Sequence, residues 1–172
     1  MSSCLHGIHK TGTTASDPQL PRGIMMLSVA EVMTAQPYTL GPDDSLVKAA
    51  ALMREHHIRH IPIVSNDGNV IGVVSHRDLL AASDSRLVHE DLLAGGKESF
   101  VALSAVMSSP VQTANENAEL RSVASLLRKQ RLGCLPITRD DQLVGIITDS
   151  DFLEVAIVLM EQLEMAEPEE DF

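Results

Sequence analysis

Two short polar segments hold the residue types best suited to chemistry in this chain. Their sequences are S-H-R-D at residues 75–78 and T-D-S-D at residues 148–151, so a hydroxyl and a carboxylate recur three residues apart. An ionised carboxylate can accept hydrogen bonds from both hydroxyls of a diol such as ribose, and the start of a helix attracts a phosphate. The same spacing also forms an ordinary helix N-terminal cap. The motif alone leaves both interpretations open, and one group can serve both.

These segments close two copies of one longer pattern, at residues 32–80 and 106–153. Pro62 returns as Pro136, 74 residues later, and Asp78 returns as Asp151, 73 residues later. A repeat this long exceeds the usual period of solenoid proteins, which favours two half-domains packed face to face over an open array.

Each copy predicts a helix, a hairpin of two strands and a second helix. The apolar positions of the first helix follow the spacing i, i+3, i+4, i+7, at Leu46, Ala49, Ala50 and Met53 and again at Leu120, Val123, Ala124 and Leu127. The strands are expected at 58–64 and 70–74, and at 132–138 and 143–147. Because proline has no N–H, the strands holding Pro62 and Pro136 should be edge strands or place the proline where no ladder bond is needed.

The composition excludes several classes of partner. The chain has 172 residues with a formal net charge of −11, 2% aromatic residues and no tryptophan. Nucleic-acid binding needs clustered Lys and Arg or aromatic platforms, so no nucleic-acid partner is expected. No apolar run approaches the roughly 18 residues of a membrane span, so no membrane partner is expected either. Cys4 and Cys134 make no disulfide framework, which favours a cytoplasmic location and a core role for Cys134.

The segments flanking the repeats are expected to be less regular. Residues 1–25 predict a disordered leader, an expression remnant or a misassigned start, and residues 166–172 an acidic tail. The first repeat is placed at 26–82, the connector at 83–101 with a short helix around 87–93, and the second repeat at 102–165. The last helix is apolar on more than one side between Phe152 and Leu163, which predicts packing beyond its own repeat.

The paired units, their proline-containing strands and the endings G-V-V-S-H-R-D and G-I-I-T-D-S-D resemble the cystathionine β-synthase (CBS) domain. Two such domains form the unit called a Bateman module. The resemblance covers about residues 28–165. It implies an α/β fold of the mixed α+β kind, with two pseudo-symmetric subdomains that are each a small three-stranded sheet with two helices. Clefts are expected between the subdomains.

Members of this family commonly bind adenosyl ligands in these clefts, among them AMP, ADP, ATP, S-adenosylmethionine and dinucleotides. The resemblance implies that Asp78 and Asp151 accept hydrogen bonds from ribose, and that Ser75 and Thr148 bind phosphate. The adenine would be held by backbone near the proline strands and by the segment after Val-Met in each copy. The remaining residues placed in the sites on this basis are Thr34, Ser108, Ile61, Pro62, Leu135 and Pro136, and the charged groups Arg59, His60, His76 and Arg77 are added because they could attract a phosphate.

The two copies differ in charge around these positions. His76 and Arg77 attract a phosphate, whereas Asp149, which stands at the place of His76 in the second copy, repels one. We therefore expect unequal clefts, with the Asp78 cleft the better phosphate site.

Arg59 and His60 leave this assignment open, because each cleft of such modules mixes both repeats and these side chains could reach a phosphate in the Asp151 cleft. His60 also follows His56 and His57 closely. Adjacent helix positions point about 100° apart, however, which disfavours a shared metal site, and no metal is expected. His60 then remains available to a phosphate.

No nucleophile–base pair, Walker loop or metal-ligand spacing is present in the sequence, so we expect no enzyme and no required cofactor. The leading hypothesis is a regulatory module that senses an adenosyl ligand and passes its state to another, unknown protein. The alternative is a homodimeric assembly module whose clefts are vestigial and whose last helix forms the interface.

Overall fold

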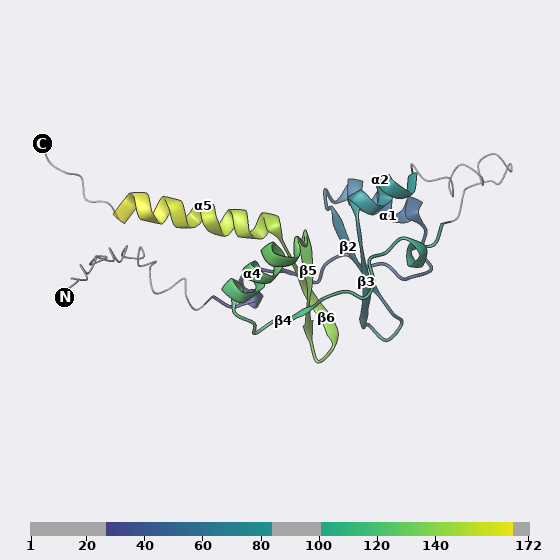
Figure 1. The fold of residues 1–172 in the computed structure, drawn as a ribbon, viewed down its shortest axis with the longest axis horizontal. Coiled ribbons are helices and arrows are strands. Elements are labelled where there is room, and N and C mark those ends of the chain that lie inside the picture. The colour runs from purple at the N-terminus through teal and green to yellow at the C-terminus, as the bar shows by residue number, and fades with distance from the viewer. Residues whose placement is uncertain (1–26, 84–100, 167–172) are drawn as a thin grey trace, which may run out of the picture.

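The computed structural model describes residues 27–83 and 101–166, in which the two repeats form two lobes side by side (Figure 1). The elements of the first repeat are η2 (Val29–Glu31), β1 (Thr34–Ala35), α1 (Leu46–Glu55), β2 (His60–Val64), β3 (Val70–Ser75) and α2 (His76–Ser83). Those of the second are η3 (Leu103–Ala105), β4 (Ala114–Asn115), α4 (Leu120–Gln130), β5 (Cys134–Arg139), β6 (Gln142–Thr148) and α5 (Asp149–Ala166).

Two hydrophobic cores lie against the two hairpins, and each is completed by the opening segment of the other repeat. Leu103 belongs to the core of the first lobe and Val29 to that of the second, and both are fully buried. Backbone hydrogen bonds hold them there, from Leu103 N to Asp44 O at 2.8 Å and from Val29 N to Ala118 O at 3.0 Å. The two repeats are therefore interlocked through their openings.

The strand pairing also joins each hairpin to a segment of the other repeat. One sheet has four strands in the order β1-β6-β5-β4, and the other has β2 and β3, to which Leu40 and Ser108 add single bridges. The predicted mixed α/β fold with two pseudo-symmetric lobes is confirmed. The predicted three-stranded sheets are not found in that form. Instead, each hairpin pairs with one short segment from its own repeat and one from the other repeat.

Pro62 and Pro136 lie inside β2 and β5, and each still pairs with a residue of the neighbouring hairpin strand. The carbonyl of Pro62 accepts a hydrogen bond from Leu40 N at 3.3 Å, on the edge of β2 that faces away from β3. The N and C=O of one strand residue point to the same edge, so the missing N–H also faces away from the hairpin ladder. In β5, the carbonyl of Thr138 accepts from Glu116 N, which places Pro136 on the equivalent edge. Both prolines thus occupy the ladder-free positions predicted as one alternative.

Most expected elements form with small changes of length. The buried positions of α1 and α4 lie on the predicted apolar stripes, although Ala50 of the first stripe is exposed. Ser28 and Glu31 form a capping box, with Ser28 N donating to Glu31 Oε2 at 2.7 Å, although the helix it starts is only a three-residue 3-10 turn. The helix expected around 87–93 lies outside the described residues.

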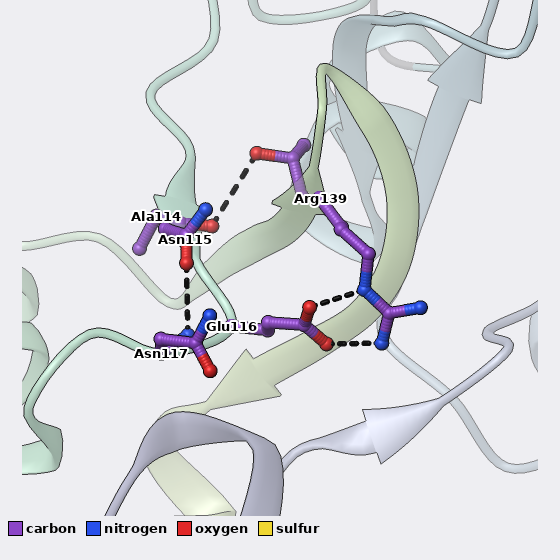
Figure 2. A network of polar contacts seen from close by, with 6 residues as sticks. Ala114, Asn115, Glu116, Asn117 and Arg139 are labelled. Atoms are coloured by element: carbon purple, nitrogen blue, oxygen red, sulfur yellow. Dashed lines mark hydrogen bonds and ion pairs between the residues drawn. The ribbon is translucent and has the colours of Figure 1, made fainter.

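One buried carboxylate fixes the edge of the larger sheet. Glu116, which is 8% exposed, accepts two hydrogen bonds from the guanidinium of Arg139 (Figure 2). Next to it, Asn117 N donates to Asn115 Oδ1 at 2.9 Å and closes the turn that follows β4. These contacts hold β4 parallel to β5.

The helix α5 extends away from the sheets (Figure 1). Phe152 and Val155 pack on the core of the second lobe, but Leu153, Ile157 and Met160 are 65%, 51% and 55% exposed. The packing that the sequence predicted for this face is not supplied by the described residues. Among the helices of the described residues, none is long and apolar enough to cross a membrane.

Candidate functional site

The two Ser/Thr-x-x-Asp motifs adopt the same geometry at the ends of β3 and β6. Asp78 Oδ2 accepts from Ser75 N at 2.7 Å and from Ser75 Oγ at 2.6 Å. Asp151 Oδ2 accepts from Thr148 N at 2.6 Å and from Thr148 Oγ1 at 2.8 Å. Both carboxylates are half-buried. Both copies therefore form the carboxylate half of a helix cap, and in the first copy Asp78 N also donates to Ser75 Oγ at 3.3 Å.

Capping leaves part of each carboxylate available. A carboxylate offers about four lone-pair sites, and the cap uses two of them on Oδ2. Among the described residues, no hydrogen bond reaches Oδ1 of Asp78 or Asp151. Oδ1 has the capacity to accept two hydroxyl donors, so the cap does not prevent ligand binding.

Thr34 and Ser108 cross to the opposite repeat. Thr34 pairs with Ile146 in β6, the strand that ends at Thr148. Ser108 pairs with Val73 in β3, the strand that ends at Ser75, through hydrogen bonds of 2.9 and 3.2 Å. Each motif therefore has beside it a segment of the other repeat.

His60 lies where the two repeats meet. It pairs with Ser75 in the first hairpin, and its ring packs against Gly133 of the second repeat, where an added Cβ would be 2.8 Å from Nε2. The neighbouring Arg59 is exposed, and its carbonyl accepts from His76 N at 2.8 Å. The side chains of His76 and Arg77 are exposed on the first turn of α2.

The predicted strand residues have no side-chain access to a ligand. Ile61 and Leu135 are 0% exposed, and Pro62 and Pro136 are also fully buried. Only their backbone can contribute to a site, which is the role that the resemblance assigned to this region.

Burial and charge shape the titratable groups at this junction. Desolvation lowers the pKa of His60, while Asp149 and, more weakly, Asp78 oppose this by favouring the imidazolium. Desolvation, with the charges of the same two aspartates, raises the pKa of Cys134 to about 12. The thiol is thus a neutral core group, as the sequence predicted.

A cavity of about 380 Å³ lies at the other ends of β3 and β6, where the two hairpin turns meet. It is lined by Asn69, Val70, Val111, Thr113, Thr138 and Asp141, none of which was placed in a site from the sequence. The turns meet through Gln142 Nε2, which donates to Asn69 Oδ1 at 3.0 Å. The composition of the two turns predicted only that they close hairpins, and it gave no indication of a cavity.

Comparison with known proteins gives the family. Residues 29–85 and 103–157 each match the CBS domain. A CBS domain-containing protein of Dictyostelium discoideum is 30% identical over 141 residues, which cover 80% of this chain and 96% of that protein. A Vibrio cholerae structure described as an acetoin utilization protein (AcuB) is 41% identical, with a TM-score of 0.68, and the match covers 83% of this chain and 99% of that one.

Two more distant structures were solved with ligands. CBSX2 in complex with AMP is 24% identical with a TM-score of 0.64, covering 77% of this chain and 98% of that one. The CBS domain pair of protein MJ0100, in complex with 5′-methylthioadenosine and S-adenosyl-L-methionine, is 24% identical with a TM-score of 0.63 and the same two coverages. At these identities the likeness is one of fold. The two tandem matches and the interlocked lobes show that this chain belongs to the CBS domain family, as a Bateman module.

Proposed function

We propose that this chain is a regulatory module that binds an adenosine-containing ligand between its two CBS repeats and performs no catalysis itself. The candidate ligands are AMP, ADP, ATP, S-adenosylmethionine and a dinucleotide. The observation that carries the proposal is the pair of half-buried carboxylates, Asp78 and Asp151, whose Oδ2 atoms are fixed by a cap. A fixed carboxylate with one unused oxygen is suited to a ribose diol, because it needs no ordering when the ligand binds.

The arrangement of the other repeat supports a composite site. Thr34 pairs with β6, which ends at Thr148, and Ser108 pairs with β3, which ends at Ser75. A ligand on either motif would contact both repeats, and its binding would change how the lobes are held together. That coupling is what a sensor requires, since a ligand shifts only an equilibrium whose states it binds unequally.

The ligands of related folds support the chemical class. CBSX2 was solved with AMP, and the MJ0100 pair with 5′-methylthioadenosine and S-adenosyl-L-methionine. These three molecules share adenine and the ribose 2′,3′-diol, and they differ in charge at the 5′ position. We infer that adenosine is the common recognition element, that the protein acts in the cytoplasm, and that its output passes to a separate protein.

Thermal unfolding with a ligand panel tests this proposal. AMP, ATP, NAD⁺, S-adenosylmethionine and adenosine are compared with GMP and with inorganic phosphate. A ligand present at a hundredfold excess over its Kd adds about 2.7 kcal/mol to the unfolding free energy, which raises Tm by about 5 to 10 °C. A rise with adenine ligands alone supports the proposal. The absence of any rise, with Kd values above millimolar by titration, contradicts it.

A second function is favoured by α5. Leu153, Ile157 and Met160 form an exposed apolar stripe at helical spacing, flanked by the acidic residues Glu154 and Glu161. This stripe suits a homodimer interface, in which case the module serves assembly and its clefts are vestigial. A ligand-insensitive dimer would favour this second function over the first.

A further inference from the structure

His60 and Gly133 are complementary replacements at the junction of the repeats. The first repeat has Arg59 and His60 where the second has Gly133 and Cys134. The imidazole occupies the space that a side chain at position 133 would fill, because a Cβ there would lie 2.8 Å from Nε2 and 3.1 Å from Cε1. The two repeats have thus diverged so that the imidazole of the first repeat fills the space left by the missing side chain at position 133 of the second.

The same glycine connects His60 to the Thr148 motif. The carbonyl of Gly133 accepts a hydrogen bond from Asp149 N at 3.3 Å, and the next residue, Cys134, pairs with Thr148 in the sheet. The ring of His60 and the first turn of α5 therefore rest on one short stretch of backbone. The imidazole thus packs against the residue that precedes β5, and Thr148 pairs with the first residue of β5.

Charged groups from three elements surround the imidazole. Asp149 on α5 and Asp78 on α2 favour its protonated form, whereas Arg59, preceding β2, and Arg77 on α2 oppose it. The thiol of Cys134 on β5 is neutral, because its pKa is about 12. Burial outweighs the aspartates, so the pKa of His60 lies below its usual value and the neutral ring is favoured.

We propose that His60 takes up a proton when a phosphate-bearing adenosyl ligand binds at the Thr148–Asp151 motif, and that it thereby selects for anionic ligands at lower pH. This inference rests on the proposed function, since it requires that the motif holds such a ligand. Protonated His60 would then offset the repulsion between Asp149 and a bound phosphate.

The direction of the pH dependence follows from the linkage between proton binding and ligand binding. A phosphate placed near the ring adds negative charge, which raises the pKa of His60 in the complex above that of the free protein. Between these two values the complex holds more protons, so affinity increases as pH falls, by at most about tenfold per pH unit. Adenosine brings no charge and should bind with no contribution from His60. The phosphate of AMP itself titrates near pH 6, but this contribution is common to all protein variants and cancels in their comparison.

Calorimetric titrations of AMP and adenosine at pH 5.5 to 7.5, in buffers of different ionisation enthalpy, test the inference. The intact protein and the variant His60→Gln are compared. We expect AMP affinity to increase about threefold to tenfold more for the intact protein than for the variant as pH falls, with the extra proton uptake confined to the intact protein. Adenosine should give no difference. Gly133→Ala, which displaces the ring without removing it, should reduce the extra uptake while Tm reports on its folding.

The outcomes separate the two proposals. Binding of both ligands with identical proton uptake in the intact protein and His60→Gln overturns the role of His60 and leaves the proposed function standing. Failure of both ligands to bind overturns the proposed function and this inference with it. Extra uptake with adenosine as well as AMP also contradicts the inference, because it would not arise from the phosphate.

Discussion

The thioether of Met33 lies against the backbone of Gly145, on the strand of the opposite repeat. A Cβ placed on Gly145 would lie 2.3 Å from the Met33 sulfur, and the equivalent contact joins Met107 to Gly72, where it would lie 2.5 Å from sulfur and 3.2 Å from the Ser108 carbonyl oxygen. Each repeat therefore presents a glycine to the opening segment of the other.

This contact predicts that Gly72→Ala and Gly145→Ala destabilise the protein. Because the added methyl group would clash with the methionine of the other repeat, we expect the free energy of unfolding to fall by about 1–3 kcal/mol, which lowers Tm by several degrees. Gly41→Ala is the matched control, since its Cβ would meet only Asp44 Oδ2 at 3.8 Å. Thermal denaturation of the three variants tests this prediction. Equal Tm values for all three would contradict close packing of Gly72 and Gly145 against the opening segments of the opposite repeats.

The buried thiol of Cys134 predicts slow chemistry. Its pKa is about 12 in the folded protein, so almost no thiolate exists at pH 8. In a Cys4→Ser background, a disulfide reagent should leave Cys134 unmodified in buffer and modify it quickly in denaturant. The raised pKa also means that its contribution to stability is present below about pH 9 and is lost as pH rises toward 12. Rapid labelling of the folded protein at pH 8 would argue against this burial.

The pair Glu116–Arg139 predicts a dependence of stability on acid pH. Hydrogen bonds from Arg139 hold the pKa of Glu116 below its usual 4.5. The stabilisation is therefore present above pH 4.5 and is lost as pH falls through the lower, folded-state pKa. Measured from pH 3 to 7, the Tm of Glu116→Gln should lie below that of the intact protein at neutral pH and approach it in acid. A double-mutant cycle with Arg139→Gln isolates the pair, and additive effects would show that the two residues act independently.

The exposed stripe on α5 predicts self-association. If a second copy covers Leu153 and Ile157, the protein should be a dimer by light scattering, and the variant carrying both Leu153→Glu and Ile157→Glu should be a monomer with helical content retained. Glu154→Gln, on the same exposed turn, should leave the dimer intact. A monomeric intact protein at high micromolar concentration would remove the basis for the assembly function.

Much of the fold could be predicted because the relevant signals are local. The apolar stripe of α1 and the ladder-free place of Pro62 both follow from patterns within a few residues. The exchange of opening segments was not predicted, because two repeats with the same pattern give no local signal for which hairpin each opening joins. Thr34 could be placed in a site, but its pairing with Ile146 of the other repeat depends on the tertiary arrangement.

The candidate site, like the fold, could be predicted only where its signals are local. The Ser/Thr-x-x-Asp spacing predicted a cap and a ligand site together, and the cap forms at Asp78 and Asp151, while the ligand role stays a prediction. The replacement of Arg59 by Gly133 in the second copy was visible in the sequence, yet the packing of His60 into that space required the two lobes to be placed. The cavity at the hairpin turns had no sequence signal, since its lining residues come from three separate segments.

The central claim is that the carboxylates of the two motifs bind the ribose of an adenosyl ligand. Calorimetric titration of adenosine into Asp78→Asn, Asp151→Asn and the control Asp44→Asn tests it most directly. The control alters a carboxylate outside the two motifs, which accepts from Gly41 N at 2.8 Å and from Lys48 Nζ at 2.7 Å. In the motif variants, asparagine keeps an acceptor for each cap. We predict at least about tenfold weaker binding in one or both motif variants, because an amide donor replaces an acceptor of the ribose hydroxyls, with affinity unchanged in Asp44→Asn. Unchanged affinity in both motif variants, with Tm values matching the control, would contradict the account.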